Sequence, residues 1–205
     1  MNELAETKEK IFDTFIELTS AHGYENVPTR DIAKRIGINA ASIYYHYKSK
    51  EEILEHVYAY YAEYQYENRR PAGEMKKIIE TESAGDIIQA LHYTFVTDDP
   101  KKYVRMILIT KIIYMRLFQD PRANAMFAES NANNIEYVVS ILKHGVEIGR
   151  IDPEFDLATF ADMLTGAMTI MGIKAFSDKN YTVGQLDQEK NIEAMLARLL
   201  SNAMI

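Results

Sequence analysis

The stretch from Pro28 to Leu54, which reads PTRDIAKRIGINAASIYYHYKSKEEIL, constrains the fold of this chain more than any other segment. It holds two short helical patterns around Gly37, followed at once by a third. Several apolar residues are spaced to form a small wedge between the first two helices, namely Ile32, Ala33, Ile36, Ile38 and Ile43. This arrangement is typical of a helix-turn-helix, in which the wedge holds the second helix at a fixed angle and leaves its other face free.

The free face of that second helix carries groups suited to duplex DNA. Its residues are Asn39, Ala40, Ala41, Ser42, Tyr44, Tyr45 and His46, with Lys48 and Lys50 just beyond. Hydrogen-bond donors, methyl groups and cations are the groups that read base edges in the major groove and neutralise phosphates. Two short helices around a glycine also occur in ordinary helical proteins, so this pattern by itself leaves both interpretations open.

The distribution of charge favours the nucleic-acid interpretation. Between Pro28 and Lys50 the single acid Asp31 stands against five cations, which are Arg30, Lys34, Arg35, Lys48 and Lys50, so the segment carries about +4. The whole chain carries −7, which leaves about −11 for the remainder. A basic patch on an acidic chain indicates nucleic-acid binding that is confined to one small module.

The segment resembles the DNA-binding domain of the TetR (tetracycline repressor) family of bacterial regulators. The matching elements are Thr29-Arg30, Ile32-Ala33, Ile36-Gly37-Ile38, Ser42-Ile43-Tyr44, His46-Tyr47, and Ser49-Lys50-Glu51 leading into Ile53-Leu54. The remaining three quarters of the chain resemble the family only in style, as a helical body with a Gly149-Arg150-Ile151-Asp152 turn before two late helices. The resemblance implies a DNA-binding domain at residues 1–50 and an effector-binding and dimerisation domain at residues 51–205.

The resemblance also implies which residues contact a DNA operator: Thr29, Arg30, Ala40, Ala41, Ser42, Tyr44, Tyr45, His46 and Lys50. Thr29, Tyr44, His46 and Lys50 match positions that mostly hold phosphates, whereas Arg30, Ala40, Ala41 and Tyr45 match positions that face bases. Two successive alanines favour methyl contacts to thymine. A homodimer would present two such helices to a palindromic operator.

Composition and periodicity predict an all-α chain of about nine helices. The first expected helix runs from about residue 6 to residue 22, two short helices follow it, and a fourth ends by Pro71. Further helices are expected over about residues 84–97, 100–118, 122–148 (with a possible interruption), 156–176 and 187–203. Gly23 is expected to end the first, and Thr29, Asn39 and the Ser49–Glu52 capping box to begin the next three. No strand alternation is visible.

Several classes of protein are disfavoured by what the sequence lacks. There is no cysteine, which excludes disulfides, thiolate zinc sites and cysteine nucleophiles. The polar start MNELAETKEK shows no signal peptide, and the apolar run 103–118 is broken by three cations and falls short of the ~20 residues of a membrane span. We therefore expect a cytoplasmic protein with no membrane partner.

The two late helices carry an apolar surface with two possible uses. Residues 155–175 are apolar nearly all round, and the last helix has a stripe at positions i, i+3, i+4, i+7 and i+8. These helices could fill the core of one chain, or could associate with a second copy. The resemblance favours a dimer interface that includes Phe160, Leu164, Met171, Ile192, Met195, Leu196 and Leu199.

Two polar residues stand where apolar ones are expected, His92 and Lys111. Lys111 falls within a face made by Val104, Ile107, Leu108 and Met115, while Arg105 and Arg116 are expected on the opposite, solvated side. A cation on an apolar face requires a partner, which could be a protein carboxylate, solvent at an edge, or a polar group of a ligand. If the partner is a ligand, we expect an effector pocket lined by Tyr61, His92, Tyr93, Lys111, Met115 and Met168.

Nothing in the sequence indicates catalysis. There is no phosphate loop or nucleophile elbow, and Glu52 with His56 makes only half of a metal site, so no cofactor or metal is expected. The sequence thus predicts a ligand-responsive transcriptional regulator, a repressor that is released from its operator by a small hydrophobic molecule. Two alternatives stay open: a helical small-molecule-binding protein or enzyme with a vestigial helix-turn-helix, and a regulator without an effector.

Overall fold

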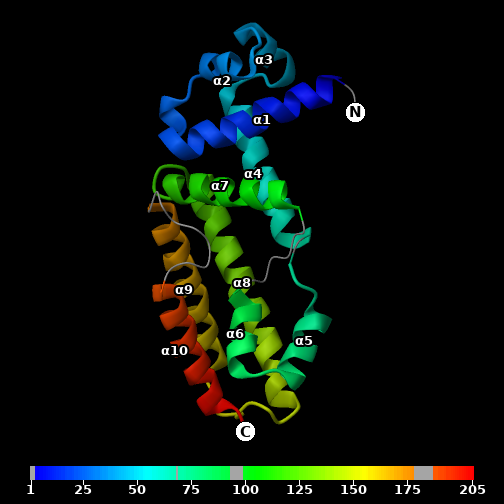
Figure 1. Cartoon of the computed structure of the whole chain (residues 1–205), viewed down its shortest axis with the longest axis vertical. Helices are drawn as coiled ribbons and strands as arrows, with labels where there is room; N and C mark the ends of the chain where they lie inside the picture. The colour runs from blue at the N-terminus through cyan, green and yellow to red at the C-terminus, as the bar shows by residue number, and fades with distance from the viewer. Residues whose placement is uncertain (1–2, 68, 93–98, 178–186) are drawn as a thin grey trace. The chain divides into compact units, whose positions relative to one another are not determined.

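The computed structural model describes residues 3–67, 69–92, 99–177 and 187–205, and within these ranges it is helical without a single strand (Figure 1). Ten α-helices and one short 3-10 helix are present in the described part of the chain, which confirms the all-α class. The extra helix relative to the expected nine is α5 (Ala72–Thr81). Sequence reasoning missed it because it is short and buries only Met75 and Ile79.

The helices form two compact units. The first contains residues 1–67 and 97–127, and the second contains residues 68–96 and 128–205. The first unit extends beyond residue 50, where the domain boundary was expected, because the helix that begins there packs with the N-terminal helices. The units describe packing, so the functional boundary at residue 50 stays a prediction.

The first unit is built around α1 (Glu3–His22). Its other elements are η1 (Tyr24–Asn26), α2 (Thr29–Ile36), α3 (Ala40–His46), α4 (Lys50–Glu67), α7 (Pro100–Arg116) and the start of α8 (Pro121–Glu147). Ile11, Phe15 and Ile16 of α1 are buried, as are Ile53 and Val57 of α4. The helix α1 contacts α2, α3, α4 and α7, so it lies at the centre of this unit.

The orientation of α7 is the reverse of the one expected. Its buried face carries Ile109, Ile113 and Arg116, whereas Val104 and Met115 are exposed. The expectation failed because arginines were assumed to be solvated. Arg116 is instead buried on the face that packs within the first unit, where carboxylates neutralise its charge.

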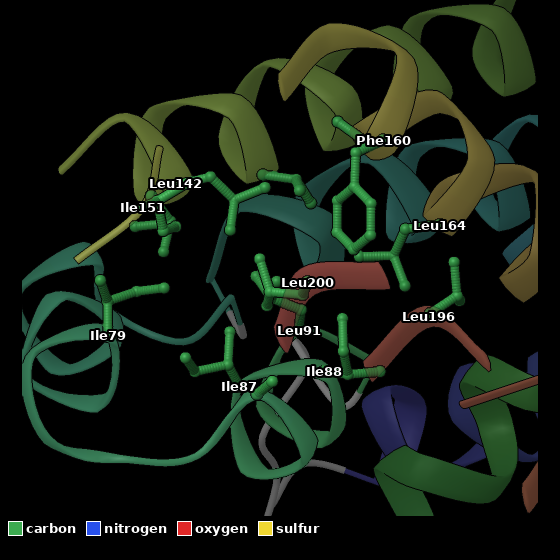
Figure 2. Packing of buried hydrophobic residues seen from close by; sticks show 14 of the residues in the cluster. Ile79, Ile87, Ile88, Leu91, Leu142, Ile151, Phe160, Leu164, Leu196 and Leu200 are labelled. Atoms are coloured by element: carbon green, nitrogen blue, oxygen red, sulfur yellow. The ribbon is translucent and has the colours of Figure 1, made fainter. Parts of the chain in front are cut away.

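The second unit has its core between α5, α6 (Ala84–His92), the later part of α8, α9 (Leu157–Ser177) and α10 (Asp187–Ala203). Figure 2 shows Phe160 and Leu164 of α9 pointing toward Leu196 and Leu200 of α10, with Leu91 of α6 beside them. All five side chains are at most 3% exposed. The late helices therefore supply a core to their own chain.

The Gly149–Asp152 segment ties the C-terminus to this unit. Gly149 has a φ of +75°, a left-handed conformation that glycine adopts without strain. The Arg150 guanidinium then donates to the carbonyl of Ile79 at 2.6 Å, and the N–H of Asp152 donates to the carbonyl of Ala203 at 2.8 Å. This turn, which resembled the family only in a general way, thus holds the C-terminal residues and α5 in place.

Candidate nucleic-acid interface

The turn between α2 and α3 sets the position of the exposed helix. Gly37 has a φ of +74°, and the N–H of Ile38 donates to the carbonyl of Ala33 at 3.0 Å, which closes α2. Ile32, Ala33 and Ile43 are buried, as the wedge predicts. Ile36, also assigned to the wedge, is only partly buried.

The helix starts agree with the sequence in part. The Asn39 side chain accepts a hydrogen bond from the N–H of Ala41 at 2.9 Å, and the Ser49 hydroxyl accepts one from Glu52 at 3.1 Å, so both of these caps are confirmed. The cap assigned to Thr29 is wrong, because α2 begins after Pro28 and Thr29 is its first residue. Its hydroxyl instead lies 3.3 Å from that of Tyr44 and links α2 to α3.

The outward face of α3 presents the side chains expected to meet DNA. Tyr44 and Tyr45 are 54% and 75% exposed, whereas Ile43 beside them is buried. Of the remaining residues of this set, Arg30, Ala41 and Ser42 are exposed, and Thr29, Ala40, His46 and Lys50 are partly so. The nine residues thus lie on α2, α3 and the first residue of α4, and the contacts assigned to them stay predictions.

Lys50 has an intramolecular partner that the sequence did not reveal. Its ammonium donates to the carbonyl of Tyr24 at 2.8 Å and lies 3.9 Å from the centroid of the Tyr24 ring. An ammonium has three donors, so this contact leaves capacity for a phosphate. Lys50 is therefore held at the edge of the module instead of extending freely into solvent.

Tyr24 connects the module to a network of charged side chains. Its hydroxyl donates to Glu51 at 2.7 Å, and Glu51 is ion-paired with Arg122. Burial, followed by the hydrogen bond to Glu51, raises the pKa of the Tyr24 hydroxyl. The tyrosine therefore stays protonated and keeps donating at any physiological pH.

Asp120 is the centre of this network. It accepts hydrogen bonds from Tyr58 at 3.0 Å, from Arg116 at 3.2 Å and from Arg122 at 2.8 Å. The hydrogen bond from Arg122 is the largest of the effects that hold the pKa of this carboxyl far below its ordinary value. In the sequence, Asp120 was visible only as a break before Pro121; the i, i+4 spacing from Arg116 was a signal that could have suggested the pair.

The residues expected to line an effector pocket are spread over both units. Tyr61 is buried, Lys111 is half-buried and Met115 is exposed, all in the first unit. Met168 packs against the core of the second unit. The side chain of His92 and the whole of Tyr93 lie outside the described residues, so the pocket stays a prediction.

The residues assigned to a dimer interface fall into two groups. Phe160, Leu164, Met171 and Leu196 are already buried within the single chain, and their place in an interface stays a prediction. Met195 and Leu199 remain 52% and 39% exposed, and Ile192 is partly buried. Further exposed apolar residues on α9, missed in the sequence, are Met163, Ile170 and Ile173.

The half metal site has other bonds in the structure. The ring Nδ1 of His56 lies 2.8 Å from the Tyr47 hydroxyl, and Glu52 accepts from the backbone N–H of Lys48. Among the residues described, no three histidine or carboxylate side chains gather as a metal site would require. Within the same residues, no helix has both the length and the apolar character needed to cross a membrane.

The locked turn, the capped third helix and its exposed face define a helix-turn-helix module of the class that bacterial transcriptional regulators use to bind DNA. Residues 11–57 match the family described as bacterial regulatory proteins, tetR family. The N-terminal module of this chain is thus similar to the DNA-binding domain of the TetR family.

Curated relatives support this assignment. The negative transcriptional regulator IcaR of the biofilm operon icaADBC from Staphylococcus epidermidis is 30% identical over 120 residues, which cover 57% of this chain and 56% of that protein. IcaR from Staphylococcus aureus strain Newman is 48% identical over 48 residues, or 23% of this chain and 26% of that protein. The chain thus spans about half the length of the first relative and about a quarter of the second.

Solved structures share the fold over the full length. A transcriptional regulator from Saccharomonospora viridis, solved in complex with choline, has a TM-score of 0.63 at 17% identity and covers 98% of both chains. A TetR-family regulator from Cytophaga hutchinsonii has a TM-score of 0.67 at 12% identity, covering 100% of this chain and 98% of that one. At such identities the likeness concerns the fold alone.

Proposed function

We propose that this chain is a transcriptional regulator that binds a palindromic DNA operator as a homodimer and acts as a repressor. The observation that carries the proposal is the exposed face of α3, held by the Gly37 turn and the Asn39 cap while Ile43 anchors its other side. A helix fixed in this way can enter the major groove without reorganising. The relatives described as negative regulators support the repressing sign.

The proposed dimer uses the apolar surface that the second unit leaves uncovered. Met163, Ile170 and Ile173 recur on one side of α9, and Met195 and Leu199 are exposed on α10, which packs beside α9 (Figure 1). Gly166 lies within this stretch, and a side chain added there would meet no atom of the same chain within 4 Å. An apolar surface with room for close approach suits twofold association of identical helices.

DNA binding is tested by selecting duplexes from a random pool with the full-length protein and measuring affinity for the selected sequence. A base-facing contact contributes about 1–3 kcal/mol, so Tyr45→Ala is expected to weaken binding to the selected duplex about tenfold. The matched control is Tyr103→Ala, an exposed tyrosine of α7 outside the helix-turn-helix. A protein that selects no sequence and shows no salt-dependent DNA affinity would instead be a helical ligand-binding protein or enzyme with a vestigial module.

The proposed effector is a small, mostly apolar molecule with a polar or acidic group. Lys111 supports it, because this cation is half-buried and no carboxylate within the described residues pairs with it. Lys111→Met keeps the length of the side chain and removes its charge. It should leave DNA affinity intact and raise the effector concentration required for release; an unchanged concentration would remove Lys111 from the site.

A further inference from the structure

A pocket lies entirely within the first unit, on α1, α4 and α7. It encloses about 240 Å³ and is lined by Lys8, Glu9, Phe12, His56, Tyr60 and Arg105. None of these residues belongs to the set expected around an effector. Pockets for drug-sized ligands hold roughly 300–1,000 Å³, so this one suits a molecule of one or two rings.

Aromatic rings form the walls of this pocket. The ring of Phe12 lies 4.2 Å from that of His56 and 5.8 Å from that of Tyr60, measured between centroids. Partial burial, and then the nearby cations Lys8 and Arg105, lower the pKa of His56. The imidazole is therefore a neutral ring at neutral pH, and the hydrogen bond to Tyr47 fixes its orientation. Three rings held in this way favour a flat aromatic guest.

The charges at the rim do not balance. Arg105 binds Asp13 at 2.7 Å and Glu9 at 2.9 Å, and Lys101 binds the same two carboxylates at 3.4 and 3.2 Å. Two cations and two anions thus neutralise one another. Lys8 stands outside this network. Its ammonium lies 5.0 Å from the Tyr47 ring centroid, and it forms no ion pair with a carboxylate of the described residues. An anionic guest would pair with the ammonium of Lys8, the cation of the lining that the two carboxylates do not neutralise.

We propose that this pocket binds a small aromatic carboxylate. The ring lies against Phe12, His56 and Tyr60, and the carboxylate is held by Lys8. A cationic guest is disfavoured because Glu9, the acidic residue of the lining, is already bound to Arg105 and Lys101. This binding requires neither DNA nor a dimer, so it can hold or fail independently of the proposed regulatory function.

The test is a titration of the full-length protein with 2-naphthoate in the absence of DNA. Binding is followed by the fluorescence anisotropy of the probe, which no tryptophan obscures because the chain contains none. A charge-assisted hydrogen bond contributes about 1.5–3 kcal/mol, so Lys8→Met should weaken saturable binding about tenfold or more. The neutral amide 2-naphthamide should bind the unaltered protein as weakly as 2-naphthoate binds Lys8→Met.

Lys10→Met provides the matched control. Lys10 lies two residues further along α1, is exposed, and pairs with Glu6 at 2.8 Å outside the pocket lining. The same charge is lost, yet affinity for 2-naphthoate should not change. The ring protons of His56 locate the guest, since their NMR shifts should move on binding. Equal affinity for Lys8→Met and the unaltered protein, binding without saturation, or an unmoved His56 signal would each overturn the proposal.

Discussion

The ammonium of Lys50 donates to the backbone carbonyl of Tyr24 at 2.8 Å, across 26 residues of sequence, and lies over the ring of the same tyrosine. This contact joins the first residue of α4 to the short 3-10 helix after α1. Lys50 is also the cation expected to reach an operator phosphate. One side chain thus has a structural contact and a proposed DNA contact, and the two can be separated experimentally.

Lys50→Ala should lower both DNA affinity and stability. Loss of one phosphate contact weakens binding to all duplexes alike and reduces the slope of log affinity against log salt by about one. Loss of the Tyr24 contact should lower the melting temperature. The control Lys48→Ala removes an exposed cation that lacks this contact, so the melting temperature of this variant should equal that of the unaltered protein. An unchanged salt slope in Lys50→Ala would exclude Lys50 from the interface.

Charging the uncovered face of α10 should separate a dimer into folded monomers. We expect Met195→Glu with Leu199→Glu to give a monomer with unchanged helical circular dichroism, because both side chains are exposed in the single chain and a charge in an apolar interface is costly. Leu196→Glu, one residue away, should instead unfold the second unit, since Leu196 is 1% exposed. Sedimentation showing an intact dimer for the double variant would place the interface elsewhere.

Replacing Asp120 should destabilise the first unit strongly. Asp120→Asn keeps the size of the side chain but leaves the buried Arg116 with only the exposed Glu25, 3.6 Å away, as a counter-ion, and breaking a buried pair costs about 3 kcal/mol or more. Tyr58→Phe removes only a hydroxyl that donates to the same carboxylate, and should cost about 1 kcal/mol. Urea denaturation measures both losses; equal small losses would mean that water already solvates the pair.

The same carboxyl should make stability depend on acidity. Its pKa lies below the ordinary value of 3.8, first because of the hydrogen bond from Arg122, so the folded state binds fewer protons than the unfolded state. The stabilisation is therefore complete above the unfolded pKa and is lost as pH falls through the folded one. Free energies of unfolding measured from pH 7 down to pH 3 should fall more steeply below about pH 5 for the unaltered protein than for Asp120→Asn. Parallel curves would contradict this assignment.

Local patterns in the sequence were sufficient for the fold class and the module. The glycine turn at Gly37 and the caps at Asn39 and Ser49 depend on interactions within a few residues of chain, and each is present as expected. In the expected capping box only the Ser49 half is present, because Glu52 accepts from the N–H of Lys48. Helical periodicity likewise identified the longer helices. The same reasoning missed α5, whose two buried residues are too few to produce a clear periodic signal.

Tertiary structure decided which side of each helix is covered. Arg105 and Arg116 were expected in solvent, yet their guanidinium groups bind Asp13 and Asp120, the first of these on a different helix. The i, i+4 spacing of Arg116 and Asp120 could have suggested their pairing, but it does not show that the pair is buried. For Arg105 the compensating carboxylate lies far away in the sequence, on another helix. The pocket on α1 depends on such a pairing and could not have been expected.

The late helices show the same limit. An apolar stripe on a helix indicates that this surface is buried against another surface. The sequence left open whether that other surface belongs to the same chain or to a second copy. The structure divides the stripe: Leu196 packs in the chain's own core, while Met195 and Leu199 stay exposed. Sequence determined that these helices form and that they bury apolar area. Only the packing of distant helices decided which residues remain for a partner, because burial is a property of neighbours and not of the residue itself.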